Sequence, residues 1–308
     1  MPVPTLTIIQ GPAIATFQGV HLYFRESITV TPQVQTFMVG TDFHGDIDER
    51  LTSLSYQITG TPCGAMNEDQ LNVLLAEPVV GASIFASGND SLVIHSLAGD
   101  KFTWHRVGIT AIPQLRLRPT ETLLGPVTWT AIGKAATQPT DAAYFRTLAS
   151  QSFSNTSFEE SEILTARYQA AFGSTPYDAM SSLNGFTVDF TLGTTPINAD
   201  DFGIVDIIVN SAMAKASFAP ANLTQAQVDT LCRLQNTGAM LPGQSFAKAG
   251  TDLVISSDVF QITLSKCGPK MGGQRFAVGS HRHDVIEWTT KRTFTSGVKN
   301  ALWTAEVL

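Results

Sequence analysis

The side chains best suited to chemistry are the two imidazoles of the segment HRHD at 281–284, His281 and His283. Residues two positions apart share one face of a strand, so these imidazoles could bind one metal ion. No spacing marks a further ligand, and the three cysteines lie too far apart for a metal-binding CxxC pair or a disulfide framework. We therefore expect a solvated or interface strand here, with no metal and no other cofactor.

A second group of candidate residues is acidic. Asp46, Asp48 and Glu49 precede an alternating stretch, and Asp200 and Asp201 occupy the equivalent loop of the second half. Carboxylates at alternate positions can bind Ca²⁺, but the other ligands of an EF-hand loop, including its closing glutamate, are missing. We expect two solvated acidic loops, and any space that both loops faced would be negatively charged.

Sequence motifs that identify enzymes are missing from the chain. There is no GxSxG, no GxGxxG after a strand, no Walker loop and no HExxH. Gly272 and Gly273 lack the spacing of a phosphate-binding loop, so we expect a mobile loop between strands. Trp129 and Trp288 could be ligand platforms, but we expect them to pack in a core or an interface. The motifs predict no catalytic residue and a protein that is not an enzyme.

The composition predicts a polar surface with few charges. Charged residues make up 15% of the 308 residues, and the net charge is −7. Such a surface suits a protein that covers much of itself with copies of itself, and the acidic balance disfavours non-specific binding to nucleic acid. The first residues show no basic segment before an apolar core, and no run of 18 apolar residues occurs. We expect no signal peptide, no membrane span and a reducing compartment.

An internal repeat organises these residues. The segment Gly45–Pro62 aligns without a gap with Gly203–Pro220, at a shift of 158 residues (203 minus 45), and four of 18 positions are identical. Repeats have to be sought first, because missing one gives the wrong fold. The identical pairs are Gly45 and Gly203, Asp48 and Asp206, Ser53 and Ser211, and Pro62 and Pro220.

Further landmarks recur at shifts of 157 to 162 residues. Short alternating runs of β-branched and aromatic residues predict strands throughout. Each half adds one short helix, the first capped by Asn67 and the second at Gln225–Leu234, then a Leu-Val-Ile strand and a late strand carrying a tryptophan. Any two β domains could share such an order, but the narrow range of shifts favours tandem duplication.

The expected fold is mainly β, with two tandem β-sandwich or barrel domains that each carry a short flanking helix. We place an N-terminal arm at 1–12, the first domain at 13–133, a linker at 134–162 and the second domain at 163–308. Glu49-Arg50 in the first copy corresponds to Ile207-Ile208 in the second. The second copy of the repeated strand is therefore predicted to be the more buried one.

These segments resemble the tail tube (major tail) proteins of long-tailed bacteriophages. The resemblance lies in RYQAAFGSTPYDAM, GFTVDFTLGTTPI, the LTQAQVDTLCRLQ helix, and DLVIS followed by RHDVIEWTTKRTF. It implies a structural virion protein whose rings stack into a hollow tube for DNA ejection. Two tandem domains imply a trimeric, pseudo-hexameric ring instead of a hexamer of single domains.

The resemblance also implies partners and a location. The chain would bind copies of itself, tape-measure protein and terminator or tip proteins, and double-stranded DNA would pass through without specific binding. It would reside in the virion tail, and in the host cytoplasm during assembly. Asp46, Asp48, Glu49, Asp200 and Asp201 could face the lumen. Two other functions stay open: another β-rich virion component (terminator, baseplate hub or capsid decoration) and a ligand-binding β-sandwich module.

Overall fold

The structure is a computed structural model of the chain. It describes residues 14–41, 45–63, 67–85, 90–96, 99–119, 122–133, 144–150, 166–199, 203–232, 251–270, 274–277, 280–292, 294–295 and 298–308. The expected N-terminal arm, Asp200, Asp201, Gly272 and Gly273 lie outside these ranges.

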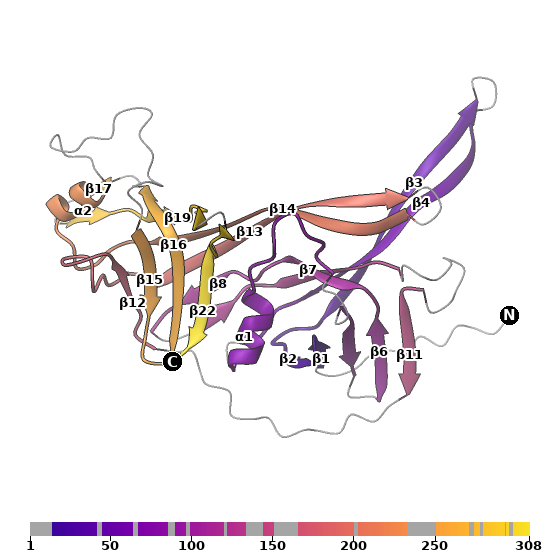
Figure 1. Cartoon of the computed structure of the whole chain (residues 1–308), viewed down its shortest axis with the longest axis horizontal. Helices are drawn as coiled ribbons and strands as arrows, with labels where there is room; N and C mark the ends of the chain where they lie inside the picture. Colours follow the sequence, from indigo (N-terminus) through magenta and orange to yellow (C-terminus); the bar gives the residue numbers. More distant parts are fainter. Residues whose placement is uncertain are drawn as a thin grey trace.

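The fold is mainly β, as the alternating sequence predicts, and the strands fall into two groups along the chain (Figure 1). In the first half a five-stranded sheet, in the order β11-β6-β5-β1-β2, faces a four-stranded sheet, β3-β4-β10-β7. The bounds of the first sheet are β1 Ile14–Phe17, β2 Val20–Tyr23, β5 Leu92–His95, β6 Asp100–Trp104 and β11 Arg146–Ser150. Those of the second are β3 Thr29–Thr41, β4 Gly45–Gly60, β7 Val107–Ala111 and β10 Val127–Ala131.

The second half repeats this arrangement, except that one strand, β16, runs through both sheets. Its strands are β12 Gln169–Phe172, β13 Phe186–Ala199, β14 Gly203–Phe218, β15 Thr251–Ser256, β16 Phe260–Lys270, β19 Ile286–Thr289 and β22 Trp303–Val307. Two short hairpins follow β16 and β19: β17 Gln274–Ala277 with β18 Ser280–His283, and β20 Phe294–Thr295 with β21 Val298–Lys299.

A tryptophan sits at the same place in the core of each half. Trp129 in β10 is fully buried, and its ring lies 6.1 Å from that of Phe17 in the opposite sheet. Trp288 in β19 is also fully buried, with its ring 4.8 Å from that of Phe172. The prediction that these tryptophans pack in the core is confirmed.

One short helix flanks each half, and both begin as the sequence predicts. Helix α1 (Glu68–Leu75) starts at Asn67 and helix α2 (Gln225–Leu231) at Thr224. Each N-cap side chain accepts the backbone N–H of a glutamine three residues on, and that glutamine's side chain accepts the N-cap N–H. This capping box satisfies two backbone donors that a helix start leaves without a partner.

The long hairpins β3–β4 and β13–β14 are equivalent at a shift of 158 residues. Thr29 opposite Thr59 corresponds to Thr187 opposite Ser217, and the same register continues to both tips. Each hairpin carries two β-bulges, at corresponding places. The extra residues are Thr52 and Ile47 in the first hairpin and Asn210 and Val205 in the second.

An aspartate follows the outer bulge in both hairpins. The Asp48 carboxylate accepts a hydrogen bond from the backbone N–H of Glu49 at 2.9 Å, and the Asp206 carboxylate accepts one from Ile207 at 2.8 Å. A short acidic side chain can satisfy a backbone donor that the disrupted ladder leaves unpaired. This geometry is a physical reason for the aspartate that the two copies share.

Part of the expected linker, 134–162, is a strand in the structure. Within it, β11 pairs with β6, and the Tyr144 side chain lies against Gly133, where a Cβ would clash with the tyrosine ring. Residues 144–150 are therefore part of the first half. The sequence suggested no strand here because small and polar residues dominate the segment.

Several contacts join the two halves. A hairpin of the first half, β8 (Leu115–Leu117) and β9 (Thr122–Leu124), lies between β7 and β10 in the sequence, and β8 pairs with β13 of the second half. The Glu77 carboxylate after α1 accepts hydrogen bonds from the Arg292 guanidinium and the backbone of Leu302. The indole N–H of Trp303 donates to the Leu75 carbonyl at 2.7 Å. These contacts hold the halves in one defined arrangement.

Candidate functional site: two equivalent hairpin arms

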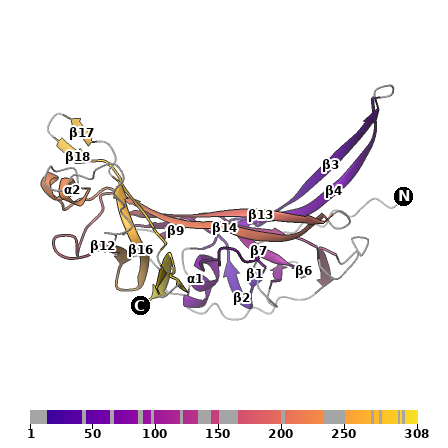
Figure 2. The ribbon, with the colours of Figure 1, turned by 45° about the horizontal axis from the view of Figure 1, so that its top comes forward.

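The β3–β4 hairpin forms an arm that projects away from the sheets (Figures 1 and 2). Its outer part has polar and apolar side chains that both face solvent, although alternation would normally bury one face. Isolated exposed apolar residues are ordinary, but a cluster on one element indicates an interaction surface. The exposed large hydrophobic residues of the arm are Val30, Val34, Phe37, Met38, Ile47 and Leu51.

One edge of the equivalent β13–β14 arm, that of β14, is covered by the first half of the same chain (Figure 2). Segment 79–85 runs along the edge of β14 and pairs with it as a strand would. The N–H of Gly81 donates to the Val209 carbonyl at 2.7 Å, the N–H of Val209 to the Ala82 carbonyl at 3.0 Å, and the N–H of Ile84 to the Ile207 carbonyl at 2.9 Å. Val209 is 0% exposed, whereas Leu51, its equivalent in the free arm, is 59% exposed.

Polar contacts supplement this pairing at the outer bulge of the covered arm. The Arg106 guanidinium donates to the Val205 carbonyl at 2.9 Å and lies 5.0 Å above the Phe85 ring. The Ser83 hydroxyl donates to the Asp206 carboxylate at 2.6 Å. The Val205 carbonyl and the Asp206 carboxylate are partly buried, and polar groups withdrawn from water need such partners, so hydrogen bonds as well as apolar contact hold the arm.

A glycine allows the tip of the covered arm to approach the free arm. Gly203 has φ +67°, and a Cβ at this position would lie 3.1 Å from the Ser53 Cα and 3.2 Å from the Thr52 carbonyl oxygen. A larger residue would be strained by its backbone conformation and would push against β4. The close approach places the second arm across the base of the first.

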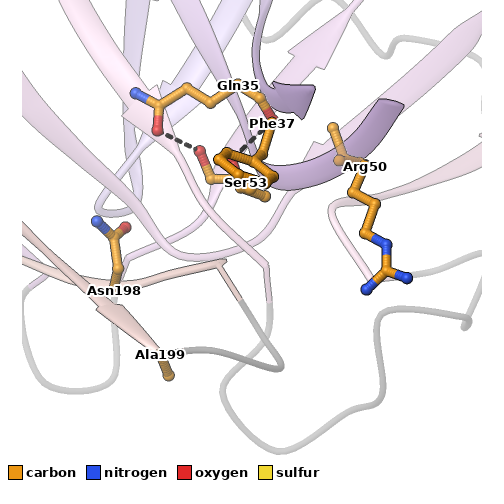
Figure 3. A pocket seen from close by; sticks show the side chains of 8 residues that line it. Gln35, Phe37, Arg50, Ser53, Asn198 and Ala199 are labelled. Atoms are coloured by element: carbon orange, nitrogen blue, oxygen red, sulfur yellow. Dashed lines mark hydrogen bonds between the residues drawn. The ribbon is translucent and has the colours of Figure 1, made fainter. Parts of the chain in front are cut away.

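A cleft of about 390 Å³ lies where the two arms cross (Figure 3). In it, the Ser53 hydroxyl donates to the Gln35 side-chain oxygen at 2.9 Å, and the Asn198 side chain of β13 points toward these two residues. The described lining includes Arg50 but no carboxylate, histidine or thiol. General acid–base or nucleophilic catalysis would need such a group, so the cleft offers no catalytic constellation.

The predicted acidic residues of the first copy lie on β4 and not in a loop before it. Asp46, Asp48 and Glu49 are exposed near the outer end of the arm. The Arg50 guanidinium lies 3.7 Å from the Asp48 carboxylate, but both side chains are solvated and such pairs contribute little. They belong to the strand because β4 pairs with β3 as far as Gly45, which lies opposite Thr41.

The end of the covered arm lies beside the middle of β4. Gly203 approaches Ser53, seven residues along β4 from Asp46, which is roughly 23 Å at a strand's rise per residue. Asp200 and Asp201 lie outside the described residues, so the negatively charged space that both acidic segments could face stays a prediction.

The other predicted sites give no sign of metal or redox chemistry in the described part of the chain. His281 and His283 lie on strand β18, and no group of three potential ligands occurs among the residues searched. Burial raises the pKa of Cys232 to about 11 and that of Cys267 to about 12, and it also raises the pKa of half-buried Cys63. Thiols with raised pKa values are protonated at neutral pH, so they are poor nucleophiles and metal ligands.

Comparison with known proteins does not identify the chain. No protein-family model matches the sequence, and no curated protein matches it. Neither of the two helices in the described ranges is long and apolar enough to cross a membrane. Function therefore has to be argued from the arms and from the halves that carry them.

Two features of this surface were missed in the sequence. The sequence predicted neither the pairing of β8 with the second half nor the role of segment 79–85. Pairing partners separated by 69 or more residues leave no mark in local spacing. The repeat could have indicated them. Where both copies of a strand carry apolar residues and one copy is exposed in the single chain, another surface is expected to cover that copy.

Proposed function

We propose that the protein is the structural subunit of a long-tailed bacteriophage tail tube, assembling into rings that stack into a hollow conduit for DNA. The observation that carries this proposal is the pair of equivalent arms, one covered inside the chain and one uncovered. The partner that we propose for the uncovered arm is a second copy of the same chain, whose second half repeats the strand order of the first. Tape-measure and terminator or tip proteins are further partners under this proposal.

The arrangement of the halves supports a closed ring. The first half contacts the second through surfaces that differ from each other, so the same contact can be repeated between the second half of one chain and the first half of the next. A heterologous contact of this kind closes into a ring when the rotation permits it. Six equivalent halves from three chains would give a trimer with pseudo-sixfold symmetry.

The charge of the chain suits a conduit for DNA. The chain has a net charge of −7 and only 15% charged residues, so it offers few basic sites that bind phosphate. An acidic lumen repels the duplex and lets it slide. Asp46, Asp48 and Glu49 lie on the exposed arm and are the described candidates for that lumen or its rim, together with Asp200 and Asp201 of the second tip.

Negative-stain electron microscopy of the purified protein over a concentration series tests this proposal. Tubes of uniform bore are expected, and end-on views should average best with threefold symmetry that contains six similar lobes. Rings that never stack would indicate a terminator-like component instead. Monomers at every concentration and salt condition would refute self-assembly.

A further inference from the structure

A short hairpin of the first half adds a strand to the edge of the second half. Strand β8 pairs antiparallel with β13, and β9 continues the sheet beyond β8. The register is Phe186 opposite Leu117, Thr187 opposite Arg116 and Val188 opposite Leu115. Val188 is fully buried in this arrangement. The sheet is therefore continuous from one half to the other.

The second half carries the counterpart of this hairpin. In β17–β18, Gln274 lies opposite His283 and Arg275 opposite Arg282. In β8–β9, Leu115 lies opposite Leu124 and Arg116 opposite Leu123, which is the same register at a shift of 159 residues. Within the described ranges, β17 pairs with β18 alone, so its other edge has no strand beside it.

The first half carries the counterpart of the edge that accepts the hairpin. Strand β3 corresponds to β13, and among the described strands it pairs with β4 only. Thr29 and Val30 stand at the positions of Thr187 and Val188. Val30 is 36% exposed where Val188 is 0% exposed. An uncovered edge of this kind presents unpaired backbone donors and acceptors to other chains.

We propose that β17 of one copy adds to β3 of the next copy, antiparallel, with Thr29 opposite Arg275 and Val30 opposite Gln274. The register is copied from the pairing inside the chain, where a threonine and an arginine also face each other at Thr187 and Arg116. The partner is a second copy of this chain. The inference rests on the head-to-tail self-association of the proposed function and names the strands that carry it.

This pairing makes each copy a donor at one end and an acceptor at the other. The donor hairpin lies in the second half and the acceptor edge in the first half. Each chain can therefore contact one neighbour through its hairpin and another neighbour through its edge. The same docking brings the exposed β3–β4 arm against the neighbouring second half, as β13–β14 lies against the first half. The apolar residues of the free arm would then be covered by the neighbour.

Disulfide trapping tests the register directly. In a Cys63→Ser background, Thr29→Cys combined with Arg275→Cys should form bonds between chains on mild oxidation. The band of a single chain on non-reducing gels should then convert to bands of two and three chains that disappear on reduction. Thr29 is exposed, so the change is compatible with folding.

Two control pairs show whether a disulfide bond forms only in the proposed register. Arg116→Cys with Thr187→Cys reproduces the same pair inside one chain, and it should oxidise without forming a multimer. Thr31→Cys with Arg275→Cys keeps the strand face but shifts the register by two residues, so it should link chains at least tenfold less efficiently. If the pair inside the chain does not oxidise, the neighbouring pairs Val188 with Leu115 and Val30 with Gln274 take its place.

The outcomes separate this inference from the proposed function. Assembled rings or tubes with no link at the matched pair, or with equal links at the shifted pair, would overturn the strand addition and leave the tube in place. Chains linked at the matched pair without any tube would support the strand addition and refute the tube. Monomers that never link would refute both.

Discussion

Replacing Leu51 of the free arm by an aspartate should weaken assembly strongly and leave the fold intact. Leu51 is 59% exposed in the single chain, while its equivalent Val209 is fully buried by segment 79–85. If the neighbouring chain covers Leu51 in the same way, its burial contributes about 1.5–3 kcal/mol to each contact. Leu51→Asp removes this burial free energy and adds the cost of desolvating a charge. The association constant should therefore fall by about tenfold to a hundredfold or more.

Sedimentation velocity over a concentration series measures this loss, and denaturant unfolding of the monomer measures stability. Leu51→Val imitates the side chain of the covered arm and should assemble as the unmodified protein does. Val209→Asp is the opposite test, because it should unfold the contact between the halves and lower the free energy of unfolding. Assembly of Leu51→Asp at unchanged concentrations would refute the idea that a second copy covers this arm.

Three further changes probe the interior. Trp129→Ala should lower the free energy of unfolding by about 3–5 kcal/mol, because the indole is fully buried. Gly185→Ala should cost about 1–3 kcal/mol and remove hydrogen-exchange protection from β8, because φ is +83° and the new Cβ would lie 2.5 Å from the Leu117 carbonyl. Above pH 9 the free energy of unfolding should fall by up to about 1.4 kcal/mol per pH unit for each of Cys232 and Cys267, because their pKa values are raised to about 11 and about 12.

The sign of the pH effect follows from the thiols. The unfolded chain releases their protons near pH 9 and the folded chain does so only at the raised pKa, so alkali favours unfolding in between. A Cys232→Ala, Cys267→Ala variant should show a shallower fall over this range. If the free energy of unfolding fell equally steeply with pH in both proteins, the raised pKa values of the two thiols would be wrong. Rapid alkylation of both thiols in the folded protein at pH 8 would contradict them as well. For Gly185→Ala, unchanged protection of β8 would contradict the close approach.

The sequence alone was sufficient for the mainly β fold, the two capped helices and the buried tryptophans. These features depend on local patterns: alternation along a strand, an N-cap followed by glutamine, and large apolar residues on the inner face. The correspondence between Gly45–Pro62 and Gly203–Pro220 was also visible, and the structure shows the two hairpins in the same register with the same bulges. Duplication as their origin and the domain boundaries stay predictions.

The tertiary structure decided which copy is covered and by what. The replacement of Glu49-Arg50 by Ile207-Ile208 predicted a more buried second copy, and in the single chain Ile207 is 5% exposed while Glu49 is exposed. The covering segment and the β8 edge contact come from distant parts of the chain, and the strand β11 lies where composition indicated a linker. Local sequence determines the periodicity of each strand, but which segment packs against which strand depends on long-range contacts. The uncovered arm could therefore be recognised only in the tertiary structure.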